Sequence, residues 1–222
     1  MSLRIPGWIV LMGALTAIGP LSIDMYLPAF PAIAHEFSAT GHVEFTLAAY
    51  FIGVALGQLF YGPISDSFGR KPPLFIGLAL FTIASAAASL ATSIESLVLW
   101  RFLQGLGSCS GMVIARAVVR DRCEPQEVAR VFSLLILVMG LAPILAPMLG
   151  GFLLQFSGWR ALFGVLTGFG ILLLFFIGGF LKESLDKTQA HPLQLGRVLK
   201  AYGGLFKHRS FMVYTLCGGL AF

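Results

Sequence analysis

Long apolar runs separated by short polar segments dominate the chain. The runs cover residues 5–28, 43–62, 74–94, 97–118, 131–155 and 161–181. A helix needs about 20 residues to cross the hydrocarbon core of a bilayer, so each run predicts one membrane-spanning helix. Another apolar run begins at Phe211 and continues to Phe222. The pattern therefore predicts an all-α integral membrane protein with six spans and the start of a seventh.

The composition supports a membrane location. Of the 222 residues, 57% are hydrophobic and 11% are charged, and the mean hydropathy is +0.88. Soluble domains carry about 25% charged residues, so this chain has too few polar side chains to cover a surface that faces water. The cysteines Cys109, Cys123 and Cys217 show no paired spacing. This spacing indicates neither a disulfide framework nor a zinc site. We also expect no other metal site and no organic cofactor.

Lysine and arginine residues gather in alternate polar segments. If the N-terminus faces the cytoplasm, 12 of the 15 basic residues lie on the cytoplasmic side and only Arg160 lies outside, while Arg101 and Arg116 fall within spans. Cytoplasmic loops of membrane proteins carry an excess of Lys and Arg, so a cytoplasmic N-terminus is the predicted orientation. The net charge of +5 follows from these loops, and no basic cluster indicates binding to nucleic acid.

Three parts of the chain follow from this pattern. Residues 1–181 are predicted to form a six-span bundle, residues 182–210 a basic cytoplasmic linker, and residues 211–222 the start of the seventh span. The linker holds six basic residues and is the longest polar segment of the sequence. Its simplest interpretation is a connector on the membrane surface without chemistry of its own.

A dense polar segment, "GPISDSFGRK" (62–71), interrupts the apolar sequence between the second and third spans. Gly62 and Pro63 are expected to end the second span, because neither residue favours a continuing helix. Gly69 allows a tight turn, and Arg70 with Lys71 can anchor the cytoplasmic interface. From the residues alone, the segment is either an ordinary basic turn or a functional motif.

Five spaced segments resemble motifs of a known family. "GPISDSFGRK" resembles the inter-helix signature of the major facilitator superfamily, although Ser67 stands where that pattern often has a basic residue. "RFLQGLGSCSG" (101–111) resembles its proton-translocation motif, and "GLAPILAPMLGG" (140–151) its antiporter motif. "IDMYLPAFP" (23–31) and "RAVVRDR" (116–122) look like the bicyclomycin- and chloramphenicol-resistance branch (Bcr/CflA type) of the drug:proton antiporters.

The resemblance covers nearly all of this chain but only the first half of a twelve-span family. It implies export of small amphiphilic antibiotics in exchange for protons by alternating access, with the proton as the coupling ion. The implied partners are the drug, the lipid bilayer and the missing C-terminal half of the same chain. One alternative is an exporter of a metabolite or another small solute. A second is a non-transporting membrane sensor or enzyme, for which the sequence shows no catalytic cluster.

Asp24 is the leading candidate for the proton carrier, because it is the only acid well inside the first span. An ionisable residue in a span usually faces a cavity or a partner, since exposure to lipid is costly. An exposed position at the outer interface is the alternative. Arg101 is expected to stabilise ionised Asp24 or to bond the backbone, with Gln104 in the same polar cluster. Its alternative is an interfacial position in which the side chain extends to water.

Two further groups of residues complete the predicted site. Arg70 and Asp121 are expected to pair and, with Asp66 and the glycines of segment 62–71, to close a cytoplasmic gate. For the arginines of "RAVVRDR", anchoring at the membrane surface is the alternative. In the fifth span, Pro143 and Pro147 lie four residues apart on one helical face. Together these prolines and the adjacent glycines predict a bent helix that seals against a partner. The gate glycines are Gly62 and Gly69, and the fifth-span glycines are Gly140, Gly150 and Gly151.

Overall fold

The computed structural model describes residues 6–38, 41–185, 196, 203–204 and 209–220. Over these residues every regular element is a helix, which confirms the all-α fold class. The chain divides into two compact units, residues 1–190 and residues 191–222. The second unit contains α9 (Arg209–Leu220), which covers most of the last apolar run.

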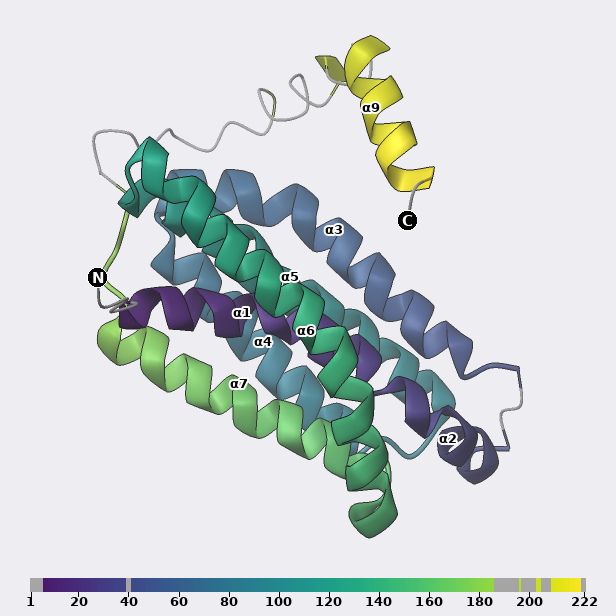
Figure 1. The fold of residues 1–222 in the computed structure, drawn as a ribbon. Helices are drawn as coiled ribbons and strands as arrows, with labels where there is room; N and C mark the ends of the chain where they lie inside the picture. The colour runs from purple at the N-terminus through teal and green to yellow at the C-terminus, as the bar shows by residue number, and fades with distance from the viewer. Residues whose placement is uncertain (1–5, 39–40, 186–195, 197–202, 205–208, 221–222) are drawn as a thin grey trace. The chain divides into compact units, whose positions relative to one another are not determined.

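The first unit contains the long helices (Figure 1). In chain order its elements are α1 (Gly7–Asp24), η1 (Leu27–Ala29), α2 (Phe30–Glu36), α3 (Glu44–Phe68), α4 (Lys71–Ser89), α5 (Ile94–Arg122), α6 (Pro125–Ser157) and α7 (Arg160–Phe180). Six stretches of the described chain are long and apolar enough to cross a membrane, with α1, η1 and α2 counted together as the first. This agrees with the six predicted spans.

Local sequence sets where these helices begin and end. The Ser93 hydroxyl accepts a hydrogen bond from the Ser96 backbone amide at 3.2 Å and caps the start of α5. Gly69 and Gly158, with φ angles of 93° and 69°, follow the last residues of α3 and α6. Glycine adopts such positive φ angles without the steric cost that other residues incur. Turns therefore separate α3 from α4 and α6 from α7.

The prediction that Gly62 and Pro63 end the second span was wrong. Both residues lie inside α3, which continues to Phe68. A proline within a helix removes one backbone hydrogen bond, and neighbouring helices in a membrane bundle can compensate for that loss. The helix ends only at Gly69, where the backbone leaves the helical region.

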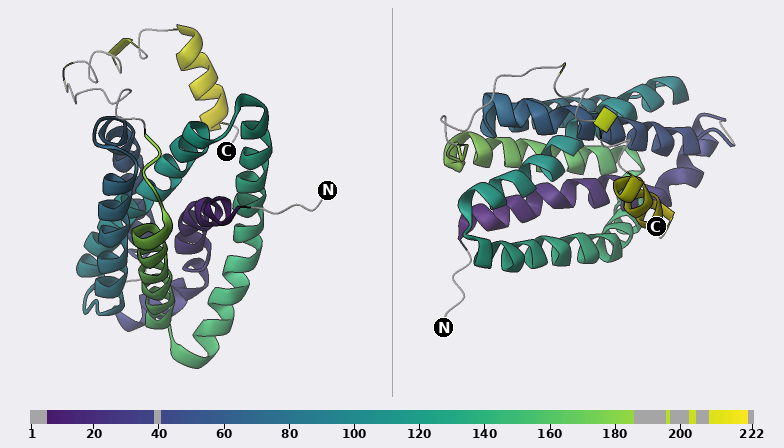
Figure 2. Two further views of the ribbon diagram at one scale, coloured as in Figure 1. Left: turned by 90° about the vertical axis from the view of Figure 1, so that its left-hand side faces the viewer. Right: turned by 90° about the horizontal axis from the view of Figure 1, so that it is seen from above.

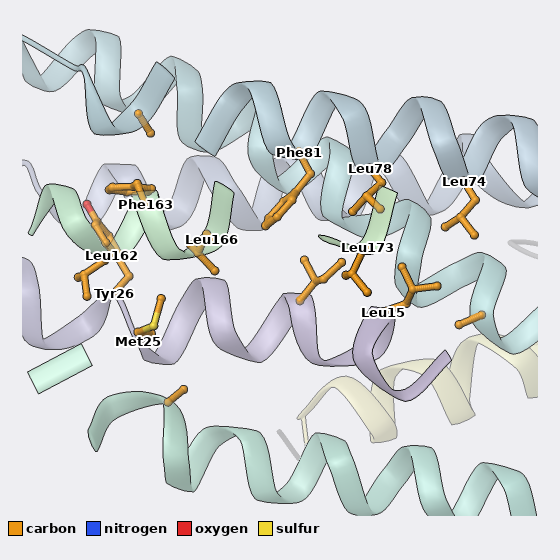
Figure 3. Close-up of a cluster of buried hydrophobic side chains, with 14 of the residues drawn as sticks. Leu15, Met25, Tyr26, Leu74, Leu78, Phe81, Leu162, Phe163, Leu166 and Leu173 are labelled. Atoms are coloured by element: carbon orange, nitrogen blue, oxygen red, sulfur yellow. The ribbon is translucent and has the colours of Figure 1, made fainter. Parts of the chain in front are cut away.

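Apolar side chains from α1, α4 and α7 meet in the core of this unit (Figure 3). The labelled residues include Leu15 of α1, Leu78 and Phe81 of α4, and Phe163 and Leu166 of α7, all of them buried. The long helices run side by side (Figures 1 and 2), with α5 packed against α1, α3 and α4. Helix α5 has the most buried span, whereas α6 has the least buried one and packs mainly against α1.

Helices α3 and α5 approach closely because glycines face backbone carbonyls at their contact. A Cβ atom on Gly53 would overlap the carbonyl of Phe102, and one on Gly105 would overlap the carbonyl of Tyr50. Small residues allow this close approach of helices in membranes. The contact places the Tyr50 ring beside Arg101 of α5.

Polar contacts mark the two ends of the bundle. At one end, the Trp159 indole donates to Glu36 at 2.6 Å, and Arg160 forms an ion pair with Glu36 at 2.6 Å. Arg160 also donates to the carbonyl of Ala91 at 3.0 Å. We call this the Glu36 end. The opposite end, where α3 meets α4 and α5 terminates, is called the Arg70 end.

Candidate functional site

Arg70 lies at the centre of a polar cluster at the Arg70 end of the bundle. Arg70 is 7% exposed. The guanidinium donates from Nε to Asp121 Oδ2 at 2.8 Å and from Nη1 to Ser65 Oγ at 3.0 Å. Nη1 also pairs with Asp66, four residues earlier in α3. The structure thus brings together three of the predicted gate residues, Asp66, Arg70 and Asp121.

The electrostatics of this cluster keep Arg70 charged. Burial alone would lower the pKa of the Arg70 guanidinium, but its hydrogen bonds to Asp121 and Asp66 raise that pKa above its ordinary value. Two carboxylates therefore compensate one buried cation. Such a cluster holds α3, the turn before α4 and the end of α5 in one arrangement.

Glu183, which the sequence analysis assigned only to the linker, belongs to the same cluster. Its carboxylate accepts hydrogen bonds from the backbone amides of Arg70 at 2.8 Å and Lys71 at 3.1 Å. It also accepts from the amides of Ser184 and Leu185 at 3.0 and 3.1 Å. Burial raises the pKa of Glu183, but these four backbone bonds outweigh it and lower the pKa below its ordinary value. The carboxylate thus caps the start of α4.

Gly69 makes room for this cap, because a Cβ atom there would lie 2.7 Å from Glu183 Oε2. Two more contacts join the same segments. Lys71 Nζ donates to the carbonyl of Gly178 at 2.9 Å, and Arg122 donates to the carbonyl of Lys182 at 2.5 Å. An acid directly after an apolar span was the only sequence signal for Glu183. Its partners at the start of α4, Arg70 and Lys71, lie more than 100 residues earlier in the chain.

Arg101 lies in a different environment, enclosed within the bundle. It is 0% exposed, so the alternative of an interfacial arginine does not hold. Its guanidinium carbon is 4.4 Å from the ring centres of both Tyr26 and Tyr50. Nη1 donates to Gln104 Oε1 at 2.6 Å, and Gln104 Nε2 donates to the Ser85 hydroxyl at 2.8 Å. Arg101 and Gln104 therefore share a cluster, to which two aromatic faces and Ser85 also belong.

Two guanidinium nitrogens of Arg101, Nε and Nη2, have no hydrogen-bond partner among the described residues. Nε and Nη2 lie on the same edge of the guanidinium plane. That edge can bind a carboxylate through two parallel hydrogen bonds. Among the described residues no hydrogen-bond acceptor occupies this edge. The arginine therefore keeps one complete carboxylate-binding edge unused.

Asp24 is the last residue of α1, where the first span breaks before η1. Its side chain is partly buried, and within the described part of the chain it forms no ion pair. The expected pairing with Arg101 is absent from this conformation, since Asp24 faces the partly exposed side of α1 and Arg101 is enclosed. Tyr26, which stacks on Arg101, lies only two residues further along the chain. A movement of the break in the first span would therefore move both Asp24 and the tyrosine that contacts Arg101.

The predicted residues of the fifth span lie on different sides of α6. Gly150 contacts the carbonyl of Met25, at the break of the first span, where a Cβ atom would overlap. Gly140 and Gly151 have open space around them, Pro143 is exposed, and Pro147 is partly buried. Gly62, inside α3, also has open space around it. In the residues that the structure describes, no group of His, Cys, Asp or Glu side chains could hold a metal ion.

Comparison with known proteins places this geometry in context. The model of the Major Facilitator Superfamily matches residues 12–222. The uncharacterized MFS-type transporter YdgK of Bacillus subtilis is 44% identical over 212 residues, which cover 94% of this chain and 53% of that protein. The bicyclomycin resistance protein homolog of Haemophilus influenzae is 32% identical, over 97% of this chain and 54% of that protein. The chain therefore spans about half the length of these curated relatives.

Further relatives and solved structures give the same picture. Multidrug resistance protein D of Escherichia coli is 32% identical over 96% of this chain and 54% of that protein. A crystal structure of the peptide transporter POT in complex with sulfate matches the whole chain with a TM-score of 0.71 at 18% identity, over 47% of the solved chain. A D-xylose–proton symporter matches 89% of the chain and 52% of the solved chain, with a TM-score of 0.67 at 19% identity. These two likenesses concern the fold alone.

Proposed function

The chain belongs to the major facilitator superfamily, and we propose that it forms the first half of a proton-coupled exporter of small amphiphilic drugs. The cargo class is proposed from relatives whose names refer to bicyclomycin and multidrug resistance. The need for a second half is proposed from their length, because this chain covers 53–54% of each. The two halves would enclose a cavity that opens to one side of the membrane at a time.

One observation carries the proposal of proton coupling. A single bundle contains an unpaired acid, Asp24, and an enclosed arginine, Arg101, whose carboxylate-binding edge is unused among the described residues. A protonated Asp24 has no need of a cation. An ionised Asp24 needs one, because an isolated charge in a membrane is costly. We therefore infer that loss of the proton moves the break in the first span and brings Asp24 to the free edge of Arg101.

This exchange provides the coupling between proton and drug. Cargo that binds beside the break favours the arrangement in which Asp24 has released its proton. Protonation of Asp24 restores the arrangement seen here, in which Arg101 lies between Tyr26 and Tyr50. A ligand shifts such an equilibrium only by its difference in affinity for the two states. Proton and cargo therefore compete without having to occupy the same atoms.

The Arg70 end is proposed to be the cytoplasmic gate. The excess of Lys and Arg in the segments near this end supports a cytoplasmic location for it and for the N-terminus. The cluster of Arg70, Asp66, Asp121 and Glu183 holds the ends of four helices together. Its contacts would differ between the two states of the transporter. Even a difference of about 1 kcal/mol changes the ratio of the two states several-fold.

Uphill transport by the full-length protein in proteoliposomes tests this function. An imposed pH gradient should drive accumulation of chloramphenicol by the wild type, whereas Asp24→Asn should abolish accumulation because the amide cannot carry a proton. Glu44→Gln is the matched control, since Glu44 is an exposed acid at the first residue of α3, and it should accumulate drug like the wild type. Wild-type accumulation by Asp24→Asn would overturn the proposal.

A further inference from the structure

Arg116 is a charged residue of α5 that belongs to neither arginine cluster. It lies six residues before the end of the helix at Arg122, which corresponds to about 9 Å along the helix axis. Its side chain is exposed, whereas its sequence neighbours Ala115 and Ala117 are buried. Arg116 is therefore a cation on the open face of a membrane-spanning helix.

No acidic side chain neutralises Arg116 within the described part of the chain. The ion pairs found there join Arg70 to two aspartates and Arg160 to Glu36. The side chain is also poorly placed to reach the interface at the Arg70 end. Helical side chains lean toward the N-terminus of their helix, and α5 runs from the Glu36 end to the Arg70 end. Arg116 therefore leans toward the middle of the span, away from the nearer surface.

The open face around Arg116 continues onto α1. One turn before Arg116, Met112 packs against Gly19 of α1. On α1, the partly exposed residues follow helical spacing through Ala14, Ala17, Leu21 and Asp24. Two helices thus form one surface with an apolar centre and two ionisable residues, Asp24 and Arg116.

The positions of the two charges along this surface follow from a backbone contact between the helices. A Cβ atom on Gly111 of α5 would lie 3.0 Å from the carbonyl oxygen of Leu15 of α1. Asp24 lies nine residues from Leu15 toward the Glu36 end, and Arg116 lies five residues from Gly111 toward the Arg70 end. At 1.5 Å per residue, the two backbone positions are about 21 Å apart along the bundle. A small amphiphilic molecule can lie between them.

A comparison with α7 indicates that this surface does not face lipid. Apart from Arg160, at its first residue, the exposed large side chains of α7 are apolar and include Val165, Ile171, Leu172 and Phe175, as expected for a lipid-facing helix. A permanently charged arginine on such a face would be costly. The α1–α5 surface therefore borders a space that contains water or a polar ligand.

We propose that Arg116 binds an anionic group, a carboxylate first of all, on the molecule that this protein transports. The inference rests on the proposed function and adds a preference within its cargo class. The guanidinium supplies charge-assisted hydrogen bonds in a site partly shielded from water, while the apolar residues between Arg116 and Asp24 contact the body of the cargo. The separation of about 21 Å keeps the bound anion away from Asp24.

Two compounds that differ by one carboxylate test the proposal. Chloramphenicol and chloramphenicol hemisuccinate share an amphiphilic body, and only the second carries a carboxylate. Binding is measured on the full-length protein in nanodiscs of neutral phosphatidylcholine, without a pH gradient. We expect Arg116→Gln to weaken binding of the hemisuccinate about tenfold, the loss typical of one hydrogen bond to a charged group. Chloramphenicol itself should bind both proteins alike.

Two matched variants refine the test. Arg116→Lys keeps the charge and should retain most of the hemisuccinate binding. Arg120→Gln removes the same charge one turn nearer the helix end and should leave binding unchanged. Failure of the wild type to bind the hemisuccinate, or equal effects of Arg116→Gln on both compounds, overturns the proposal. If added anionic phosphatidylglycerol lowers wild-type binding to the level of Arg116→Gln, the site belongs to lipid headgroups and the proposal also fails.

The test is separate from that of the proposed function. A protein that accumulates chloramphenicol through a pH gradient, yet binds the hemisuccinate independently of Arg116, loses this inference and keeps the transport assignment. A protein whose hemisuccinate binding depends on Arg116, but which moves no drug in a pH gradient, keeps the anion site and loses proton-coupled export.

Discussion

Arg70 and Arg101 are the two buried arginines of the described bundle, and their surroundings differ completely. Arg70, 7% exposed, contacts the carboxylates of Asp66 and Asp121. Arg101, 0% exposed, contacts two tyrosine rings and the side-chain oxygen of Gln104, and two of its nitrogens have no hydrogen-bond partner among the described residues. The first arginine has its counter-charges in this half of the protein. The second has binding capacity that the described residues leave unused.

The difference indicates that the two buried arginines have different roles in one bundle. A buried cation that has carboxylate partners can hold helices in a fixed arrangement. A buried cation without one is costly, since cation–π contacts contribute only about 2 kcal/mol each even when desolvated, whereas transfer of a charge out of water costs several kcal/mol. Arg101 thus has unused binding capacity in the state seen here, and an ionised carboxylate that reaches its free edge stabilises the other state.

The largest expected effect comes from Arg101→Met. This variant should lose drug-driven proton movement completely, because no cation remains to receive ionised Asp24. Its thermal stability should stay equal or rise, since apolar replacement of buried charges is often neutral or stabilising by about 1–4 kcal/mol. Proton movement in proteoliposomes and Tm in detergent measure the two properties. If Arg101→Met couples like the wild type, or if its Tm is many degrees lower, the proposed difference between Arg101 and Arg70 is contradicted.

Arg101→Lys sharpens the same comparison. Lysine keeps the charge but lacks the planar edge with two parallel donors. We expect Arg101→Lys to remain folded but to couple drug and proton movement poorly, because lysine cannot form the proposed two-bond contact with ionised Asp24. Full coupling by the lysine variant would show that charge alone is sufficient.

A smaller effect on transport and a larger one on stability are expected for Arg70→Met. Removal of this cation leaves the carboxylates of Asp66 and Asp121 without their counter-charge. We expect the free energy of unfolding to fall by about 1–3 kcal/mol. Asp121→Asn should cost more than Asp66→Asn, because the Asp121 side chain is 19% exposed and that of Asp66 is 61% exposed. Thermal unfolding of the three variants ranks them. Equal Tm values for wild type and Arg70→Met would contradict a structural role at this end.

The smallest effect is expected for Glu183→Gln, which keeps the shape of the cap and removes its charge. We expect a loss of about 0.5–1 kcal/mol near neutral pH. Because the folded pKa of Glu183 lies below its ordinary value, this stabilisation is fully present above the ordinary pKa of about 4.3 and is lost as the pH falls through the folded pKa. The Tm difference between wild type and variant should therefore shrink below about pH 4. A difference that grows on acidification would contradict the assigned role of the carboxylate.

Much of the fold was predictable from the sequence, because apolar length alone determines where a chain can cross a bilayer. The six spans agree with the helices to within a few residues at most ends. The main error was at Gly62 and Pro63, where residue preferences predicted an end and α3 continues for six more residues. Packing and membrane burial override local preference at such positions, and the real end depends on the positive φ of Gly69.

The candidate site was predictable only in part. Charged residues inside spans or in a hinge, such as Asp24, Arg101 and Arg70, are visible in the sequence because apolar surroundings make them rare. The capping of α4 by Glu183 was not visible, since it joins backbone amides and a carboxylate that are 112–113 residues apart. The tyrosines beside Arg101 were not singled out for that role, because aromatic residues are common throughout membrane spans.

Loss of a proton from Asp24 on drug binding is the central claim, and infrared difference spectroscopy measures it most directly. Addition of chloramphenicol to the full-length protein should remove the C=O stretching band of a protonated carboxylic acid in the wild type and in Glu44→Gln. The band should be missing from the difference spectrum of Asp24→Asn. If Asp24→Asn shows the same loss as the wild type, another acid releases the proton and the account is contradicted.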